Sequence, residues 1–144
     1  MLALRLDQAK RLFFDRAGVM QATTAAERQV LSRFGAFVRQ RARTSIRPRR
    51  GTSQPGQPPF SHVGLLRTGI LFAFDPERRS VVIGAVRLNQ RGGEAPRLLE
   101  HGGTAWRAVH GTERAVRYRA RPFMAPAFAA ELARMPPLWK DSLR

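Results

Sequence analysis

The chain has 144 residues, 43% of them hydrophobic, which suits one domain with a buried core and leaves little for a second. It has no cysteine, which excludes disulfides and thiolate metal sites. Its 26 basic and 10 acidic residues give a net charge of +16, and every basic residue except Lys10 and Lys140 is arginine. Arginine suits phosphate and carboxylate contacts. A GC-rich genome would also favour arginine over lysine, but would not explain the excess of positive charge.

The N-terminal residues alternate apolar and charged types and lack the cleavage site of a signal peptide. No stretch approaches the roughly 20 apolar residues of a membrane span. We therefore expect a soluble protein made inside the cell, with no membrane partner. Residues 3–20 predict an amphipathic helix, weakened at Gly18.

A second helix is predicted from Thr24 to about Thr44, because residues 24–27 (TAAE) have the spacing of a capping box. Its buried face is expected to hold the apolar residues Val30, Leu31, Phe34, Phe37, Val38 and Ala42. Six arginines and no acid follow in residues 39–50, and then a run rich in proline and glycine. Residues 47–61 therefore predict an extended basic arm, and loops of this length are usually functional or disordered.

Residues 69–74 and 80–86 predict a β-hairpin whose turn begins at Asp75 and Pro76. A mobile loop at 87–95 and a short helix at 96–101, ended by Gly102, are expected next. Residues 104–109 and 114–120 predict a second hairpin, and residues 124–135 a helix. The last residues, 136–144, read as a tail anchored by Leu138 and Trp139.

This order of elements predicts an α+β fold, with a small antiparallel sheet of about four strands packed against N-terminal helices and a C-terminal helix. We expect a single domain over residues 1–144. It divides into a helical part (1–46), the basic arm (47–61), the sheet with the C-terminal helix (62–135) and the tail (136–144).

The sequence favours no catalytic chemistry. His62, His101 and His110 lack the spacing of metal ligands, and no nucleophile or phosphate-loop motif is present. The few acidic residues are scattered; Asp75 and Glu77 fall in a predicted turn, so a two-metal nuclease centre is poorly supported. We therefore expect no enzyme activity, cofactor or metal.

The arginines of residues 39–50 are the best candidates for contact with nucleic acid. The run lacks the interleaved aromatic residues of single-strand binders and matches no base-reading motif, so sequence-specific recognition is not expected. A solvated basic face, or an arm that docks on an acidic protein neighbour, explains the same residues equally well.

Three stretches in this order resemble a family of small bacteriophage proteins. They are the proline-rich loop leading into GLLRTGI (64–70), LLEHGGT (98–104) and ARPFMAPA (120–127). The resemblance, over roughly residues 55–132, is to neck proteins of tailed bacteriophages that join head to tail or complete the tail. His101 and Gly103 depart from the aromatic-Gly-Thr of that family.

The resemblance implies a virion protein, made in the bacterial host cytoplasm, that forms a ring of sixfold or twelvefold symmetry between the portal side and the tail. Its expected partners are copies of itself, head-completion or portal-side proteins, tail-tube proteins and genomic DNA in the lumen. The alternative from charge alone is a nonspecific DNA-binding protein, and a weaker third possibility is an enzyme such as a nuclease.

The resemblance and the basic arm together give two sets of candidate residues. Subunit contacts are expected at Arg47, Arg49, Arg50, Pro55, Pro58, Pro59, Phe60, Leu65, Arg67, Glu100 and Arg121. Structural roles are expected at Gly64, Gly69, Gly102, Pro122, Phe123 and Pro126, with Phe128 as a further core anchor. Glu100 is expected to cap a neighbour's helix or to pair with arginine, and the arm to reach another chain in the assembled particle.

Overall fold

The spine of the protein is one long helix, α2 (Arg16–Ser45), in a computed structural model that describes residues 16–86, 88, 94–140 and 142. At 1.5 Å per residue, its 30 residues span about 45 Å. The buried residues Val30, Phe34, Val38 and Ala42 recur every four positions and form a stripe along it. This confirms four of the six predicted core residues. Leu31 is half-buried, and Phe37 remains 46% exposed.

The predicted helix start at Thr24 is wrong. The chain is helical through this point, and the hydroxyl groups of Thr23 and Thr24 donate to the carbonyl oxygens of Val19 and Met20 at 2.8 and 2.9 Å. These are bonds to residue i−4 within a helix, not bonds to free N–H groups at its start. Gly18 costs a helix only about 1 kcal/mol relative to alanine, too little to end it. The rest of the helix predicted at 3–20 falls outside the described residues.

Both predicted hairpins are confirmed. Strand β1 (Ile70–Asp75) pairs antiparallel with β2 (Ser80–Ala85), and β3 (Gly103–Val109) pairs antiparallel with β4 (Thr112–Tyr118). The first turn follows the sequence signal, because Asp75 Oδ1 accepts the backbone N–H groups of Glu77 and Arg78 at 3.0 and 3.2 Å. The loop predicted at 87–95 lies largely outside the described residues.

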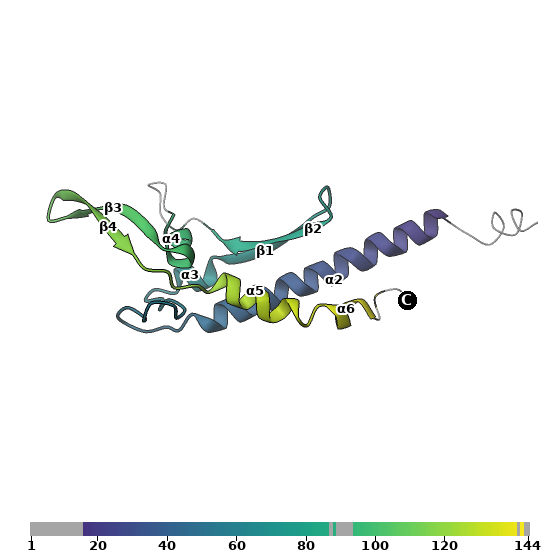
Figure 1. The fold of residues 1–144 in the computed structure, drawn as a ribbon. Helices are drawn as coiled ribbons and strands as arrows, with labels where there is room; N and C mark the ends of the chain where they lie inside the picture. Colours follow the sequence, from purple (N-terminus) through teal and green to yellow (C-terminus); the bar gives the residue numbers. More distant parts are fainter. Residues whose placement is uncertain (1–15, 87, 89–93, 141, 143–144) are drawn as a thin grey trace, which may run out of the picture.

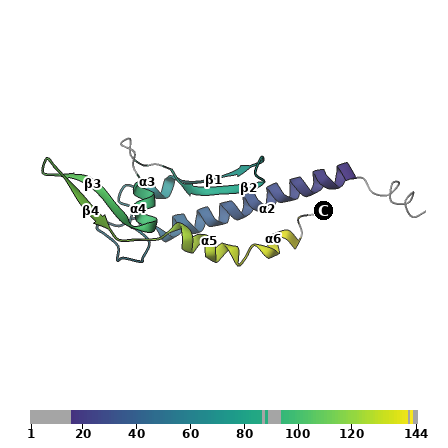
Figure 2. The same cartoon turned by 45° about the horizontal axis from the view of Figure 1, so that its top comes forward.

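The prediction of one four-stranded sheet is wrong, because the two hairpins form separate two-stranded sheets. The short helix α4 (Ala95–His101) precedes β3 and confirms the helix predicted there. Gly102 and Gly103 follow it with φ angles of 73° and 140°, which only glycine adopts readily. These two residues turn the chain away from α2, so β3–β4 leaves the molecule in the opposite direction from β1–β2 (Figures 1 and 2).

The core lies where α2, the first hairpin and the last helices meet. It comprises Phe34, Val38, Ala42, Ile46, Leu66, Ile70, Phe123 and Ala127. The single-turn helix α3 (Leu65–Thr68) contributes Leu66. Helix α2 lies so close to the β1–β2 sheet at Gly35 that an added Cβ would lie 2.7 Å from a methyl group of Val81. A glycine in this otherwise good helix therefore serves packing.

The C-terminal part differs from the prediction in its last third. Helix α5 (Met124–Leu132) ends three residues before the predicted boundary, and residues predicted as a tail form a second short helix, α6 (Pro136–Lys140). Proline is compatible with the first turn of a helix, because that turn leaves its N–H groups unpaired. Leu138 packs on the core as expected, whereas Trp139 is 40% exposed.

The resulting α+β molecule is elongated, with β3–β4 projecting at one end and the N-terminal half of α2 at the other (Figure 1). The chain exposes 11588 Å², whereas a compact monomer of 16.2 kDa exposes about 7,500 Å². If every residue outside the described part is counted as fully extended chain and its area is subtracted, the described residues still expose about 7,400 Å². A compact monomer of the same mass as those residues would expose about 6,500 Å².

Candidate interaction site

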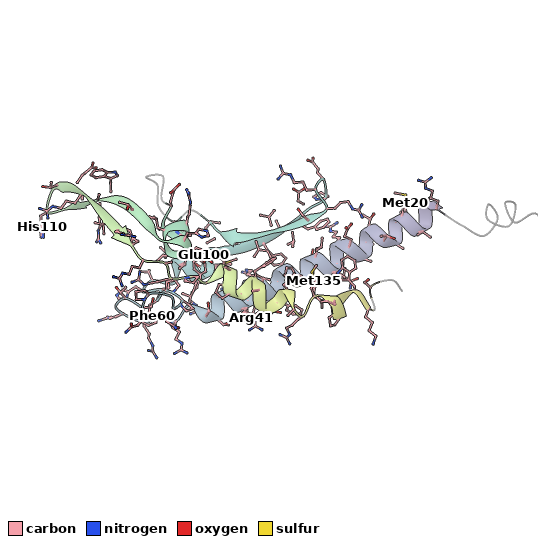
Figure 3. The ribbon with its side chains drawn as sticks, in the orientation of Figure 1. Met20, Arg41, Phe60, Glu100, His110 and Met135 are labelled. Atoms are coloured by element: carbon pink, nitrogen blue, oxygen red, sulfur yellow. The ribbon has the colours of Figure 1, made fainter. Side chains whose placement is uncertain are left out.

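The start of α5 is held by the carboxylate of Glu100, which lies centrally in the molecule (Figure 3). Its Oε2 accepts the backbone N–H groups of Phe123 and Met124, both at 2.9 Å, and its Oε1 accepts that of Ala125 at 2.8 Å. A helix start leaves such N–H groups without partners and carries partial positive charge, so a carboxylate is the favoured cap. Glu100 therefore caps a helix of its own chain, whereas a cap on a neighbouring subunit or a pair with arginine was expected.

The basic loop, residues 47–61, closes on its own chain. Arg47 and Phe60 form a β-bridge, and the N–H of Ser61 donates to the carbonyl of Arg47 at 3.0 Å. The N–H of Gly56 donates to the carbonyl of Ala120 at 2.9 Å, which joins the tip of the loop to the residues before α5. In the single chain the segment is therefore a closed loop and not the extended arm that was expected.

Arg121 joins the loop to the rest of this junction. Its Nε donates to the carbonyl of Ser53 at 2.9 Å, and its backbone N–H donates to the carbonyl of Leu99 in α4 at 2.6 Å. Ser53 is 5% exposed, and its hydroxyl has no hydrogen-bond partner in the described structure. The loop, the end of α4 and the start of α5 thus converge on one junction, although they are far apart in the sequence.

The residues expected to contact other subunits divide into an inward and an outward set. Glu100 and Arg121 make the internal bonds described above, Pro59 is buried, and Arg67 Nε donates to the carbonyl of Arg43 at 3.2 Å. The exposed or half-exposed members of the set are Arg47, Arg49, Arg50, Pro55, Pro58, Phe60 and Leu65. The Arg49 guanidinium lies 5.8 Å from the Phe60 ring centroid, a cation–π contact that shapes this face.

The arginines before the loop are partly engaged in holding the fold. Arg39 Nε donates to the carbonyl of Ile70 at 2.8 Å, which fixes the start of β1 on α2. Arg41 forms an ion pair with Glu131. Arg39 and Arg41 are thus engaged in contacts within the chain, whereas Arg47, Arg49 and Arg50 remain exposed on the candidate nucleic-acid surface.

The structure gives the residues expected to have structural roles different surroundings. Gly64 and Gly102 have φ angles of 79° and 73°, as tight turns require, but Gly69 has an ordinary φ of −76°. An added Cβ at Gly69 would still lie 3.0 Å from the carbonyl oxygen of Leu65. Close packing, not unusual backbone geometry, therefore favours glycine there.

The two prolines of ARPFMAPA flank the start of α5. Pro122 is half-buried just before the helix, and Pro126 is exposed within its first turn. Phe123 is 1% exposed and is a core anchor, as expected. Phe128 is 45% exposed, although its ring packs edge-on against Phe34 with centroids 5.6 Å apart.

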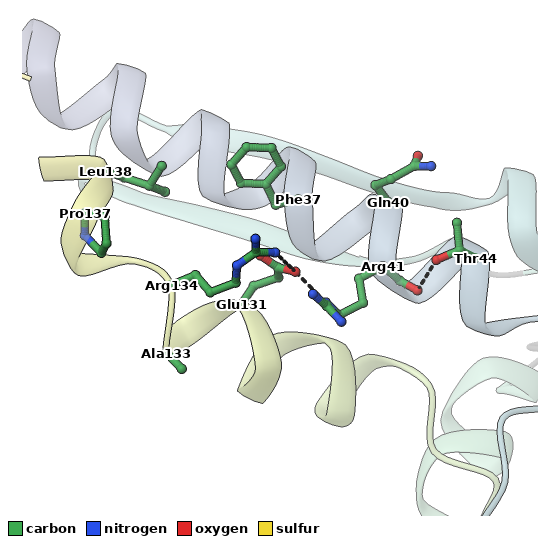
Figure 4. Close-up of a pocket in the computed structure, with 9 residues that line it drawn as sticks. All are labelled: Phe37, Gln40, Arg41, Thr44, Glu131, Ala133, Arg134, Pro137 and Leu138. Carbon is green, nitrogen blue, oxygen red and sulfur yellow. Dashed lines mark hydrogen bonds and ion pairs between the residues drawn. The ribbon is translucent and has the colours of Figure 1, made fainter. Parts of the chain in front are cut away.

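A hollow of about 760 Å³ between α2, α5 and α6 was not anticipated (Figure 4). Glu131 lies in its wall with a side chain 5% exposed, paired with Arg41 and 3.7 Å from Arg134. Phe37 and Leu138 form the apolar part of the wall. The sequence contains a signal for Glu131, because it lies four residues after the buried Ala127 and therefore on the inner face of α5. Both arginines lie next to the same carboxylate oxygen, Oε1, and the pair with Arg41 ties α5 to α2.

The second hairpin carries residues that the sequence reasoning did not single out. Trp106 on β3 is 73% exposed, and Arg107 lies directly opposite Arg114 in the strand register. None of the four arginines of residues 107–119 forms an ion pair with a carboxylate in the described structure. Like charges opposite each other destabilise a hairpin. This element therefore presents both an exposed aromatic ring and unneutralised charge.

The candidate catalytic and metal-binding residues are not brought together. Within the described ranges, no group of three or more histidine, aspartate or glutamate residues could hold a metal ion. His110 lies at the tip of the projecting hairpin, far from Glu100 (Figure 3), and His62 Nδ1 lies 3.4 Å from the carbonyl oxygen of Arg49. Among the helices that the structure describes, none is long and apolar enough to span a membrane.

No known protein family, curated protein or solved structure matches this chain.

Proposed function

We propose that the protein is a structural component of the neck of a tailed bacteriophage. In this role, copies of the chain form a ring that joins the head to the tail or completes the tail, and genomic DNA passes through the ring. The proposal places the protein in the virion after synthesis in the host cytoplasm. Its neighbours are portal-side or head-completion proteins on one side and tail-tube proteins on the other.

The observation that carries the proposal is the amount of surface that the single chain leaves uncovered. The described part exceeds the surface of a compact monomer, and its exposed large apolar residues include Trp106, Val82 and Leu71 at 73, 61 and 50%. Leu71 and Val82 lie on the outward side of β1–β2 and Trp106 on the projecting β3–β4 hairpin, and exposed apolar patches often mark interaction sites. A subunit that completes its packing against neighbours explains them.

The resemblance to neck proteins is supported by the convergence of its three stretches. Arg121, in the third stretch, contacts both the proline-rich loop and α4, while Glu100, in the second, caps the helix that the third begins. Residues widely separated in the sequence thus act together in one junction. A shared pattern of this kind is expected when it specifies a common fold, and the neck function follows by analogy with that family.

Quantitative mass spectrometry of phage particles tests the proposal. Particles are purified by density from the producing culture and treated with nuclease, so that DNA-bound contaminants are removed. We expect this chain at a low and fixed ratio to the major capsid protein, as a single ring requires. Absence of the chain from such particles contradicts the proposal.

The alternative of a nonspecific DNA-binding protein is favoured by Arg107 and Arg114, which face each other without a carboxylate partner in the described structure. It predicts tight duplex binding by the isolated chain, with affinity that falls steeply as salt rises. Fluorescence anisotropy with duplexes of unrelated sequence over a salt series measures this. The neck role instead requires only weak contact with DNA in the lumen.

A further inference from the structure

The β3–β4 hairpin has two chemically different faces. Cross-strand partners share a face, so the register places Arg107 and Arg114 on one side and Trp106 with Ala115 on the other. The members of the Trp106 face are Thr104, Trp106, Ala108, Glu113, Ala115 and Arg117, and all six are exposed. One acid and one base balance each other there. We call this the apolar ribbon face, because its centre is Trp106 with Ala115 opposite it and Ala108 next to it along the strand.

No other element of the described chain supports this ribbon along its length, and it projects beyond the end of α2 (Figures 1 and 2). A two-stranded hairpin alone in water is marginally stable, and usually needs a further strand or a packed face. Trp106 is the largest side chain on it and is 73% exposed. Tryptophan is typical of the few residues that dominate a protein interface.

The β1–β2 hairpin offers an exposed face of matching character. Its inner face packs on α2, while Leu71 and Ala73 point outward beside their partners Gly84 and Val82. Leu71 is 50% and Val82 61% exposed. We call these four residues the outer sheet face. None of these four is charged. Asp75 and Ser80 continue the same face at the turn, where Arg78 lies 4.0 Å from Asp75, so the acid and the base balance each other.

Gly84 makes the outer sheet face flat, although neither its backbone conformation nor packing within the described residues calls for a glycine there. Its φ lies outside the left-handed region, and an added Cβ would meet no atom of the described residues within 4 Å. A glycine within a strand weakens it, and often marks a place where another group approaches the backbone closely. Beside Leu71 it leaves a flat site, open to the ring of a tryptophan.

We propose that the apolar ribbon face of one copy docks on the outer sheet face of a second copy, with Trp106 lying over Gly84. The dimensions agree, because seven-residue strands extend about 23 Å and six-residue strands about 20 Å. The two hairpins point in opposite directions along the molecule (Figure 1), so each copy can use both surfaces at once. Two different surfaces of one chain that bind each other generate a ring or a filament.

A second copy fits these surfaces better than an acidic partner or nucleic acid does. The chain carries a net charge of +16, so copies repel unless they meet through uncharged or balanced patches. The apolar ribbon face and the outer sheet face meet that condition. The arginine pair on the opposite side of the ribbon is then left free to face the DNA of the lumen. This orientation toward DNA rests on the proposed function, whereas the contact between copies does not.

Two single substitutions and their mixture test the contact. Gly84→Val fills the flat site while improving the strand propensity of β2, and Trp106→Ser removes the ring that fills it. We expect the full-length chain to form oligomers at about 100 µM in sedimentation velocity, and each variant alone to remain monomeric. Equimolar mixing supplies one intact ribbon and one intact sheet face, so a dimer and nothing larger is expected.

The matched control is Arg114→Gln, which alters the opposite side of the same ribbon and is expected to leave oligomers unchanged. Circular dichroism melting of each variant shows whether its fold is retained. In a Trp139→Phe background, Trp106 is the only tryptophan, so its emission should shift to shorter wavelength as oligomers form. An unchanged emission maximum, or oligomers that survive both Gly84→Val and Trp106→Ser, overturns the proposal.

Failure of this contact and failure of the proposed function are distinguishable. If the chain is found at a fixed ratio in particles but both variants still assemble, the neck role stands and its subunits meet elsewhere. A full-length chain that stays monomeric at the stated concentration also overturns the self-docking proposal. Tight duplex binding that Trp106→Ser abolishes assigns the ribbon to nucleic acid instead.

Discussion

Removing the carboxylate of Glu100, a half-buried side chain, should clearly destabilise the protein. Glu100→Ala leaves three N–H groups at the start of α5 without their acceptor, two of them part-buried. Loss of an N-cap costs about 0.5–2 kcal/mol, and a hydrogen bond to a charged group contributes about 1.5–3 kcal/mol. Since water can replace part of this at the exposed Ala125, we expect a loss of about 3 kcal/mol in the free energy of unfolding.

The isosteric change Glu100→Gln separates charge from shape. The single carbonyl oxygen of glutamine can still accept the N–H groups of Phe123 and Met124. Its NH₂ group would face the N–H of Ala125, donor against donor, so we expect a loss of about 1 kcal/mol in the free energy of unfolding. Urea unfolding followed by circular dichroism measures both. The control is Glu94→Ala, because Glu94 is 57% exposed and, among the described residues, forms an ion pair only with Arg97; the change should alter stability by about 0.5 kcal/mol or less. A loss below about 1 kcal/mol for Glu100→Ala would refute the assignment of Glu100 as the cap.

Three further predictions concern the spine and the loop. Thr24→Ala should raise the melting temperature slightly, because alanine is the better residue inside a helix; a loss of about 1 kcal/mol would instead indicate a helix start. Gly35→Ala should lower stability by about 1–3 kcal/mol in thermal melts, because its Cβ would overlap Val81 despite the better helix propensity; unchanged stability contradicts the close packing. Reversing the charge of the exposed loop arginines to glutamate should leave the melting temperature nearly unchanged but impair joining of heads to tails, and unchanged infectivity of phage carrying the variant contradicts a role in assembly. These arginines are Arg47, Arg49 and Arg50.

The junction around Glu100 shows how far local pattern reasoning reaches. The sequence indicated that a helix ends at Gly102 and that another starts near Phe123, and both are confirmed. It did not indicate that the acid at the end of one helix caps the start of the other. A cap supplied from a distance of 23 residues has no local signature, because its geometry depends on how the two segments pack.

The same limit explains the errors on sheet and helix boundaries. Thr24 to Glu27 has the letters of a capping box, but a cap forms only where the preceding residues leave the helix, and residues 16–23 do not. The β-rich runs and turn residues within residues 70–118 predicted four strands correctly. The division of these strands into two sheets depends on the direction that Gly102 and Gly103 give the chain.

The sequence by itself determined the α+β class, both hairpins, α4 and the irregular basic loop, because turn residues, periodicity and glycine stops act over a few residues. Only the tertiary structure decided which charged residues are engaged within the chain, such as Glu100, Arg121 and Glu131, and which remain outside, such as Arg49. It also decided that Trp106 and the outer sheet face stay exposed. Burial depends on which distant segments meet, and a periodic pattern gives the face of an element but not the surface that covers it.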